Sequence, residues 1–118
     1  MELSEIKSLT QSKDFCSSNI LKVVLGITEL DVAVFCKLGE EDCDIKKIAQ
    51  KVKRDRSSVQ RSLKNLIAAG LVSRQSISMR RGRKYTYTAI TMGKLKEILI
   101  SRIEKYCSIL KEQVRIME

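Results

Sequence analysis

Residues 44–74 read DIKKIAQKVKRDRSSVQRSLKNLIAAGLVSR, and this stretch decides the fold. Asp44 and Asp55 are residues of a type that caps helices, and apolar side chains follow each of them at helical spacing. A short turn joins the two predicted helices, Gly70 closes the second, and small Ala49 suits the point where they cross. The inward positions are Ile45, Ile48, Ala49 and Val52 in the first helix and Val59, Leu63, Leu66 and Ile67 in the second.

A β-hairpin is predicted directly after the two helices. Leu71–Ser78 and Tyr85–Ile90 alternate as strands do, and Met79–Lys84 forms a basic tip in which Gly82 takes a positive φ. We expect Tyr87 and its neighbour Tyr85 to pack on the hairpin rather than to stack on bases. Helix, turn, helix and hairpin in this order is the winged helix-turn-helix fold, which is mainly α with one small hairpin, the wing.

The segments before this core also favour helices. Residues 2–25 contain two helix-like stretches, the second beginning at Ser12 or Asp14 and stopping before Gly26. Thr28 then caps a central helix whose faces are mostly apolar. That helix is expected to run from Glu29 to Leu38 and to end at Gly39.

A last helix begins after Thr91 and continues to about Val114 or beyond. Its apolar stripe is longer than a small domain can cover, so pairing with a second copy is favoured over folding back onto its own domain. The predicted dimerisation residues are Leu95, Leu99, Ile103, Tyr106 and Leu110. With 118 residues, we expect a single winged-helix domain with a helical segment at 1–26, a core at 27–91 and a dimerisation helix at 92–118.

The positive charge is concentrated in one part of the chain. The net charge is +9, yet residues 45–84 contain thirteen basic residues and a single acid, Asp55. A block of nearly one sign indicates a polyanionic partner, and the scarcity of aromatic residues argues against a membrane surface. We expect double-stranded DNA.

Composition excludes several other classes of function. Because the chain has no His, it can have neither a catalytic His dyad nor a His-ligated metal. It also has no Gly-rich phosphate loop and no Cys-x-x-Cys pair, so we expect no enzyme, no metal site and no cofactor. No stretch approaches the ~20 apolar residues of a membrane span, and the start MELSEIKS lacks the pattern of a signal peptide. We therefore expect a cytoplasmic protein.

Polar residues on the outer face of the second helix are candidates for DNA contacts. Arg suits guanine, Gln suits adenine, and Ser or Lys suits phosphates, while the free N–H groups of the helix N-terminus favour a phosphate. The candidates are Arg56, Ser57, Ser58, Gln60, Arg61 and Lys64. The basic hairpin tip suits a DNA backbone or minor groove through Arg80, Arg81, Arg83 and Lys84.

The run at 44–74, followed by MRRGRKYTYTAIT at 79–91, resembles the DNA-binding domain of archaeal TrmB-like and MarR-like winged-helix transcriptional regulators. The resemblance covers about residues 28–92 and includes the helix-to-wing junction from Leu63 to Val72. It implies that the contact positions of the recognition helix are Ser57, Gln60, Arg61 and Lys64, and that those of the wing are Arg81, Arg83 and Lys84. Longer TrmB-like proteins carry a C-terminal sugar-binding domain that this sequence does not contain, so sugar sensing of that kind is not expected.

The four cysteines leave their pairing open. Cys36 is expected to be a small buried apolar residue. The N-terminal helical segment is expected to complete the dimer interface of the last helix. Cys16 and Cys107 therefore lie on the two expected dimer helices, where a disulfide could form between or within subunits.

These observations favour a sequence-specific, double-stranded DNA-binding transcriptional regulator that acts as a homodimer, with two recognition helices about 34 Å apart on a palindromic operator. Two alternatives remain. One is a protein-interaction module of a transcription or chromatin assembly, and the other is an RNA-binding winged helix.

Overall fold

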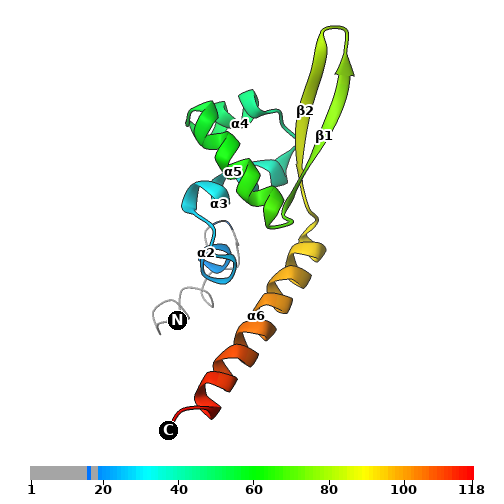
Figure 1. Cartoon of the computed structure of the whole chain (residues 1–118). Helices are drawn as coiled ribbons and strands as arrows, with labels where there is room; N and C mark the ends of the chain where they lie inside the picture. The colour runs from blue at the N-terminus through cyan, green and yellow to red at the C-terminus, as the bar shows by residue number, and fades with distance from the viewer. Residues whose placement is uncertain (1–15, 17–18) are drawn as a thin grey trace.

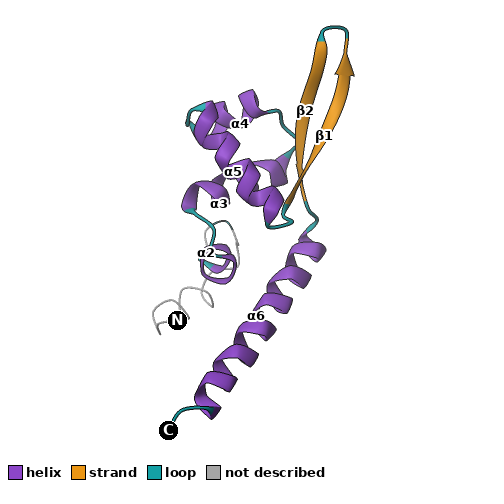
Figure 2. Cartoon of the chain, viewed as in Figure 1, coloured by secondary structure: helices purple, strands orange, loops and turns teal. Residues whose placement is uncertain are grey.

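A computed structural model describes residue 16 and residues 19–118. It has the predicted winged helix-turn-helix fold, in which most of the helices form one group, a two-stranded hairpin rises beside them, and the last helix extends away from the base of the hairpin (Figures 1 and 2). The elements are α2 (Ile20–Leu25), α3 (Glu29–Glu40), α4 (Ile45–Val52), α5 (Arg56–Ala68), β1 (Val72–Met79), β2 (Gly82–Ala89) and α6 (Met92–Arg115).

One apolar core joins α2–α5, the base of the hairpin and the first turns of α6. The helix-turn-helix contributes fully buried Ile48, Val59 and Leu66, and α3 contributes Val34. Burying such side chains provides the main drive for folding, at roughly 1.5–3 kcal/mol for each. The predicted inward position Ile67 is instead 39% exposed, because it lies at the edge of the helix stripe and lines a surface groove beside the hairpin.

Helix starts follow the predicted caps. The side chains of Thr28, Asp44, Asp55 and Thr91 each accept a hydrogen bond from the backbone N–H three residues later, at 2.8–3.2 Å. Thr28 forms a complete capping box, because the carboxylate of Asp31 accepts the backbone N–H of Thr28 at 3.1 Å. These side chains satisfy N–H groups that a helix leaves unpaired.

The turn of the helix-turn-helix is as short as predicted. Lys53 adopts a left-handed conformation with φ 56°, and the backbone N–H of Arg54 donates to Ala49. Gly70, with φ 79°, follows the last turn of α5 and sends the chain into the hairpin. A side chain is strained at such angles, so Gly suits this position.

The hairpin is longer and its tip tighter than predicted. The strands pair without interruption from Val72 with Ala89 to Met79 with Gly82, so that only Arg80 and Arg81 remain as the turn. The difference arises because Gly82, at φ 91°, allows the chain to turn while still pairing with Met79.

A third short segment joins the base of the hairpin. The backbone groups of Cys43 and Tyr87 exchange two hydrogen bonds, at 2.9 and 3.3 Å. The chain reaches this bridge through Glu41, which is extended and forms the cap of α3. Gly39 therefore lies inside α3, and the prediction that it ends the helix was wrong.

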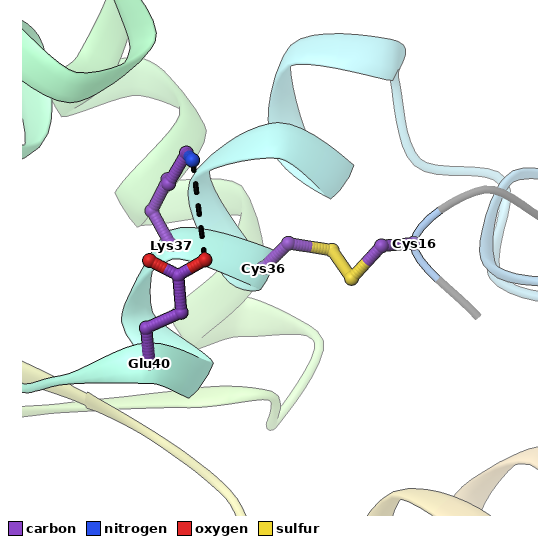
Figure 3. Close-up of a disulfide and its surroundings, with 4 residues drawn as sticks. All are labelled: Cys16, Cys36, Lys37 and Glu40. Atoms are coloured by element: carbon purple, nitrogen blue, oxygen red, sulfur yellow. Dashed lines mark ion pairs between the residues drawn. A yellow bond between two sulfur atoms is a disulfide. The ribbon is translucent and has the colours of Figure 1, made fainter. Parts of the chain in front are cut away.

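Two predictions for the N-terminal part are corrected. Within the described residues the second helix begins at Ile20, and Cys16 lies in a turn rather than in that helix. A disulfide joins Cys16 to Cys36 of α3 (Figure 3). Cys36 is therefore a half-buried disulfide partner, and the expectation of a buried apolar residue was wrong. The first helix-like stretch and the starts proposed at Ser12 or Asp14 lie outside the described residues.

The last helix extends away from the rest of the fold (Figure 1). Its 24 residues span about 36 Å at 1.5 Å per residue, and the molecule measures 65 × 26 × 25 Å. Leu95 and Leu99 are buried near α2, whereas every residue from Ile100 onward is exposed. None of the described helices is long and apolar enough to span a membrane.

Candidate nucleic-acid interface

The outer face of α5 presents the predicted polar residues to solvent. Arg56, Ser57, Gln60, Arg61 and Lys64 are all exposed. They occupy the face opposite the buried residues that attach α5 to the core. From Arg56 to Lys64 the helix therefore offers a polar surface about two and a half turns long.

The N-terminus of α5 already holds an anionic group. Asp55 accepts both the backbone N–H and the hydroxyl of Ser58, at 3.1 and 2.7 Å. These hydrogen bonds from Ser58 lower the pKa of Asp55. The cap thus satisfies the backbone N–H of Ser58, and the half-buried side chain of Ser58 is engaged in the same cap.

The wing carries its four predicted basic residues in different settings. Arg80 and Arg81 form the exposed turn at the far end of the hairpin, and Arg83 follows on β2. Lys84 forms an ion pair with Asp44 at 3.2 Å. The hydrogen bond from the backbone N–H of Lys47 lowers the pKa of Asp44, and the side chain of Lys84 lowers it further by a smaller amount. The wing residues thus differ in how far a nearby carboxylate compensates their charge.

Two grooves separate α5 from its neighbours. The larger, of about 630 Å³, lies between α5 and the hairpin, and the smaller, of about 330 Å³, is bounded by the starts of α4 and α5 and by β2. Residues lining the larger groove are Ser57, Gln60, Arg61, Leu63, Lys64, Ile67, Arg74 and Tyr87. Residues lining the smaller groove are Asp44, Ile45, Lys46, Arg56, Gln60, Arg83, Lys84, Tyr85 and Tyr87. The structure therefore brings Arg56 and Gln60 together with Arg83 and Lys84 in the smaller groove. Ser57, Arg61 and Lys64 line the larger groove with Gln60, whereas Ser58, Arg80 and Arg81 line neither groove.

Two cations of this surface were missed from the sequence. Arg74 lies on β1, five residues before the basic tip, and Lys46 lies in the first turn of α4. The alternation of the strand could have indicated Arg74. Arg74 is two residues from buried Val72, so both side chains lie on the same face of the hairpin. That face borders α5.

Glu41, at the end of α3, is paired with two lysines of α4. Glu41 forms ion pairs with Lys51 and Lys47, and their hydrogen bonds lower its pKa, Lys51 having the larger effect. The same contact with Glu41 raises the pKa of Lys51.

Buried Cys43 has a raised pKa because burial disfavours the thiolate. Among the described residues, no group of His, Cys, Asp and Glu is suited to hold a metal ion.

The predicted dimerisation residues divide into two sets. Leu95 and Leu99 are 1% and 8% exposed within the single chain. Ile103, Tyr106 and Leu110 are 38–64% exposed and lie farther along α6. Only the second set is open to a partner.

Comparison with known proteins agrees with the fold. A family model described as "Sugar-specific transcriptional regulator TrmB" matches residues 21–92. Methanocaldococcus jannaschii contains an uncharacterised relative, MJ1503, that is 32% identical over 98% of this chain and 89% of its own length. A second uncharacterised protein from that archaeon, MJ1082, is 30% identical over 77% of each chain.

Solved structures give the same result. A possible transcriptional regulator from Methanosarcina mazei has a TM-score of 0.77 and 21% identity, covering 85% of this chain and 87% of its own. The ST1889 protein from Sulfolobus tokodaii has a TM-score of 0.67 and 26% identity, covering 78% and 92%. The family is described as one of transcriptional regulators, and the first of these structures as a possible transcriptional regulator. The family match spans more than half of the sequence and includes the helix-turn-helix and the wing, so the chain belongs to the TrmB family of winged-helix transcriptional regulators.

Proposed function

We propose that this protein is a homodimeric, sequence-specific regulator that binds double-stranded DNA with α5 in the major groove and the wing on the backbone or in the minor groove. The observation that carries the proposal is the joint surface of α5 and the hairpin. Its exposed Arg56, Arg61, Lys64 and Arg83 have no carboxylate partner among the described residues. Such a surface suits the phosphate-lined grooves of a duplex.

Roles within this surface follow from chemistry and position. Arg61 and Gln60 stand near the middle of α5, and their side chains suit guanine and adenine edges. Ser57 and Lys64 lie one turn to either side and suit flanking phosphates. Arg80 and Arg81 extend farthest from the helices and reach DNA beside the major groove. Ser58 supports the helix cap instead of contacting DNA.

The homodimer part of the proposal rests on α6. Its outer half presents Ile103, Tyr106, Leu110 and Val114 at spacings of three and four residues, so they share one face. A solvent-exposed apolar stripe of this length favours a matching surface, and a second copy supplies one through two-fold symmetry. Two α5 helices about one DNA turn apart would then suit a palindromic site.

The proposal is tested by titrating random and selected duplexes at two salt concentrations, with sedimentation of the free protein. We expect salt-sensitive binding by a dimer. Arg61→Ala should weaken specific binding and relax base preference, whereas Arg83→Ala should weaken all sequences and reduce the salt slope by about one. Lys105→Ala on α6 removes the same charge away from this surface and serves as the control.

Two outcomes would favour a different function. Equal affinity for double-stranded RNA and DNA would favour an RNA-binding winged helix. A dimer that binds neither nucleic acid at low salt would favour a protein-interaction module. If Arg83→Ala bound duplex DNA with wild-type affinity at every salt concentration, the assignment of the wing to the DNA interface would be wrong.

A further inference from the structure

Arg74 is the one cation that the hairpin contributes to the larger groove beside α5. Its cross-strand partner is Tyr87, which is buried and lines the same groove. On the opposite wall stand Arg61 and Lys64 of α5. The groove therefore has positive charge on both walls and no acidic residue in its lining.

An aromatic ring holds Arg74 in place. Its guanidinium carbon lies 4.4 Å from the ring centroid of Tyr85, which is the diagonal neighbour of Arg74 across the hairpin. A guanidinium over a ring face gains a cation–π attraction and still has its N–H groups available around its edge. Tyr85 thus restricts the side chain without using its hydrogen-bond donors.

Arg74 differs from the nearby lysines in having no ion-pair partner among the described residues. Lys84 is paired with Asp44, and Lys47 and Lys51 are paired with Glu41. Within the described part of the chain, the contact with Tyr85 is the interaction that the Arg74 side chain makes, and no carboxylate lies within ion-pair distance. A positioned guanidinium with unused donors is suited to a bidentate phosphate contact.

We propose that Arg74, positioned by Tyr85, binds a backbone phosphate of duplex DNA between the strand edge and α5. This inference rests on the proposed function and adds a fixed anchor to it. The contact sets the register of α5 in the major groove and carries no base preference of its own. Tyr85 is a positioning residue, because it acts through the guanidinium.

The test measures duplex affinity against salt for the full chain and four variants. Arg74→Ala should lower affinity about tenfold or more and reduce the salt slope by about one, equally for specific and random sequences. Arg74→Lys keeps the charge and the slope but loses the stacked, bidentate geometry, so affinity should fall severalfold. Tyr85→Leu should lower the duplex affinity about two- to fivefold without changing the salt slope. Tyr85→Phe keeps the ring, so its affinity should match that of the wild type.

Lys105→Ala is again the matched charge control, and thermal melting checks that each variant folds. An Arg74→Ala variant indistinguishable from Lys105→Ala, in a protein that does bind duplex DNA, would overturn the phosphate anchor alone. A loss of base preference without a change in slope would also overturn it, by making Arg74 a base-reading residue. A Tyr85→Leu variant with wild-type affinity would overturn the positioning role. Failure of the wild type to bind any duplex would overturn both the anchor and the proposed function.

Discussion

Replacement of Leu110 by Ser tests the α6 interface with a magnitude that follows from exposure. Leu110 is 64% exposed in the single chain. Full burial of a Leu side chain contributes about 1.5–3 kcal/mol, so covering the exposed part contributes about 1–2 kcal/mol per copy. A symmetric dimer contains the residue twice and loses about 2–4 kcal/mol. The dimer dissociation constant should therefore rise about 30- to 1,000-fold.

Sedimentation equilibrium over a wide range of protein concentration measures this change directly. Lys105→Ser, at an exposed position outside the apolar stripe, is the control and should leave the dissociation constant unchanged. Under conditions where both proteins are monomeric, Leu110→Ser should melt like the wild type, because the side chain is largely free of its own fold. An unchanged dissociation constant for Leu110→Ser would refute the assignment of this face to a second copy. A lower melting temperature of the monomer would mean that the stripe packs within one chain.

Three further predictions concern stability. Leu66→Ala empties a fully buried position and should lower the free energy of unfolding in urea by about 2–5 kcal/mol; a loss below about 1 kcal/mol would contradict that burial. Asp44 has a pKa below its usual 3.8, chiefly because the backbone N–H of Lys47 donates to it, so its stabilisation is present above that pH and lost as pH falls through the folded value. Asp44→Asn should therefore be less stable than wild type at neutral pH, and the difference should shrink as pH falls. A difference in the free energy of unfolding that is the same at every pH would argue against this linkage. Cys16→Ser removes a cross-link to Cys36 that spans 20 residues, and chain entropy predicts that the free energy of unfolding falls by about 3 kcal/mol. Reduction of the wild type should cause an equal loss, and a wild-type stability that does not respond to reductant would contradict the prediction.

Local chemistry made much of the fold predictable. Thr28, Asp44, Asp55 and Thr91 each begin a helix because a side chain and a backbone N–H only three residues apart satisfy each other. Gly70 closes α5 by a conformation that glycine adopts without strain. Such signals depend on few neighbours, so they can be recognised without knowledge of the tertiary structure.

The errors occurred where distant parts of the chain meet. Gly39 remains helical because the chain becomes extended only at Glu41, before the bridge that Cys43 makes with β2. The disulfide partner of Cys16 depends on where Cys16 lies relative to α3, and spacing alone does not determine it. These features require the packed structure.

The candidate site shows the same division. The polar face of α5 follows from its apolar stripe, because the two faces of one helix are complementary. Arg74 was missed because it stands outside the basic run at the tip, and its importance depends on the strand register that brings it over Tyr85. The exposed half of α6 was expected from its length, but the burial of Leu95 and Leu99 required knowledge of α2.

The bridge between Cys43 and Tyr87 divides the wing into two mechanical parts. Near Tyr87 the strand β2 is hydrogen-bonded on both edges, to β1 and to the segment before α4. Beyond Gln75 and Thr86 only two strands remain, with side chains that are exposed or half-buried, and such a ribbon is weakly stabilised in water. The wing is thus a stiff base bearing a compliant outer arm, and amide exchange should be slow at Tyr87 and progressively faster toward Arg81. On a duplex, such an arm can bend to follow the local width of the groove, while its clamped base keeps the helix-turn-helix in a constant orientation.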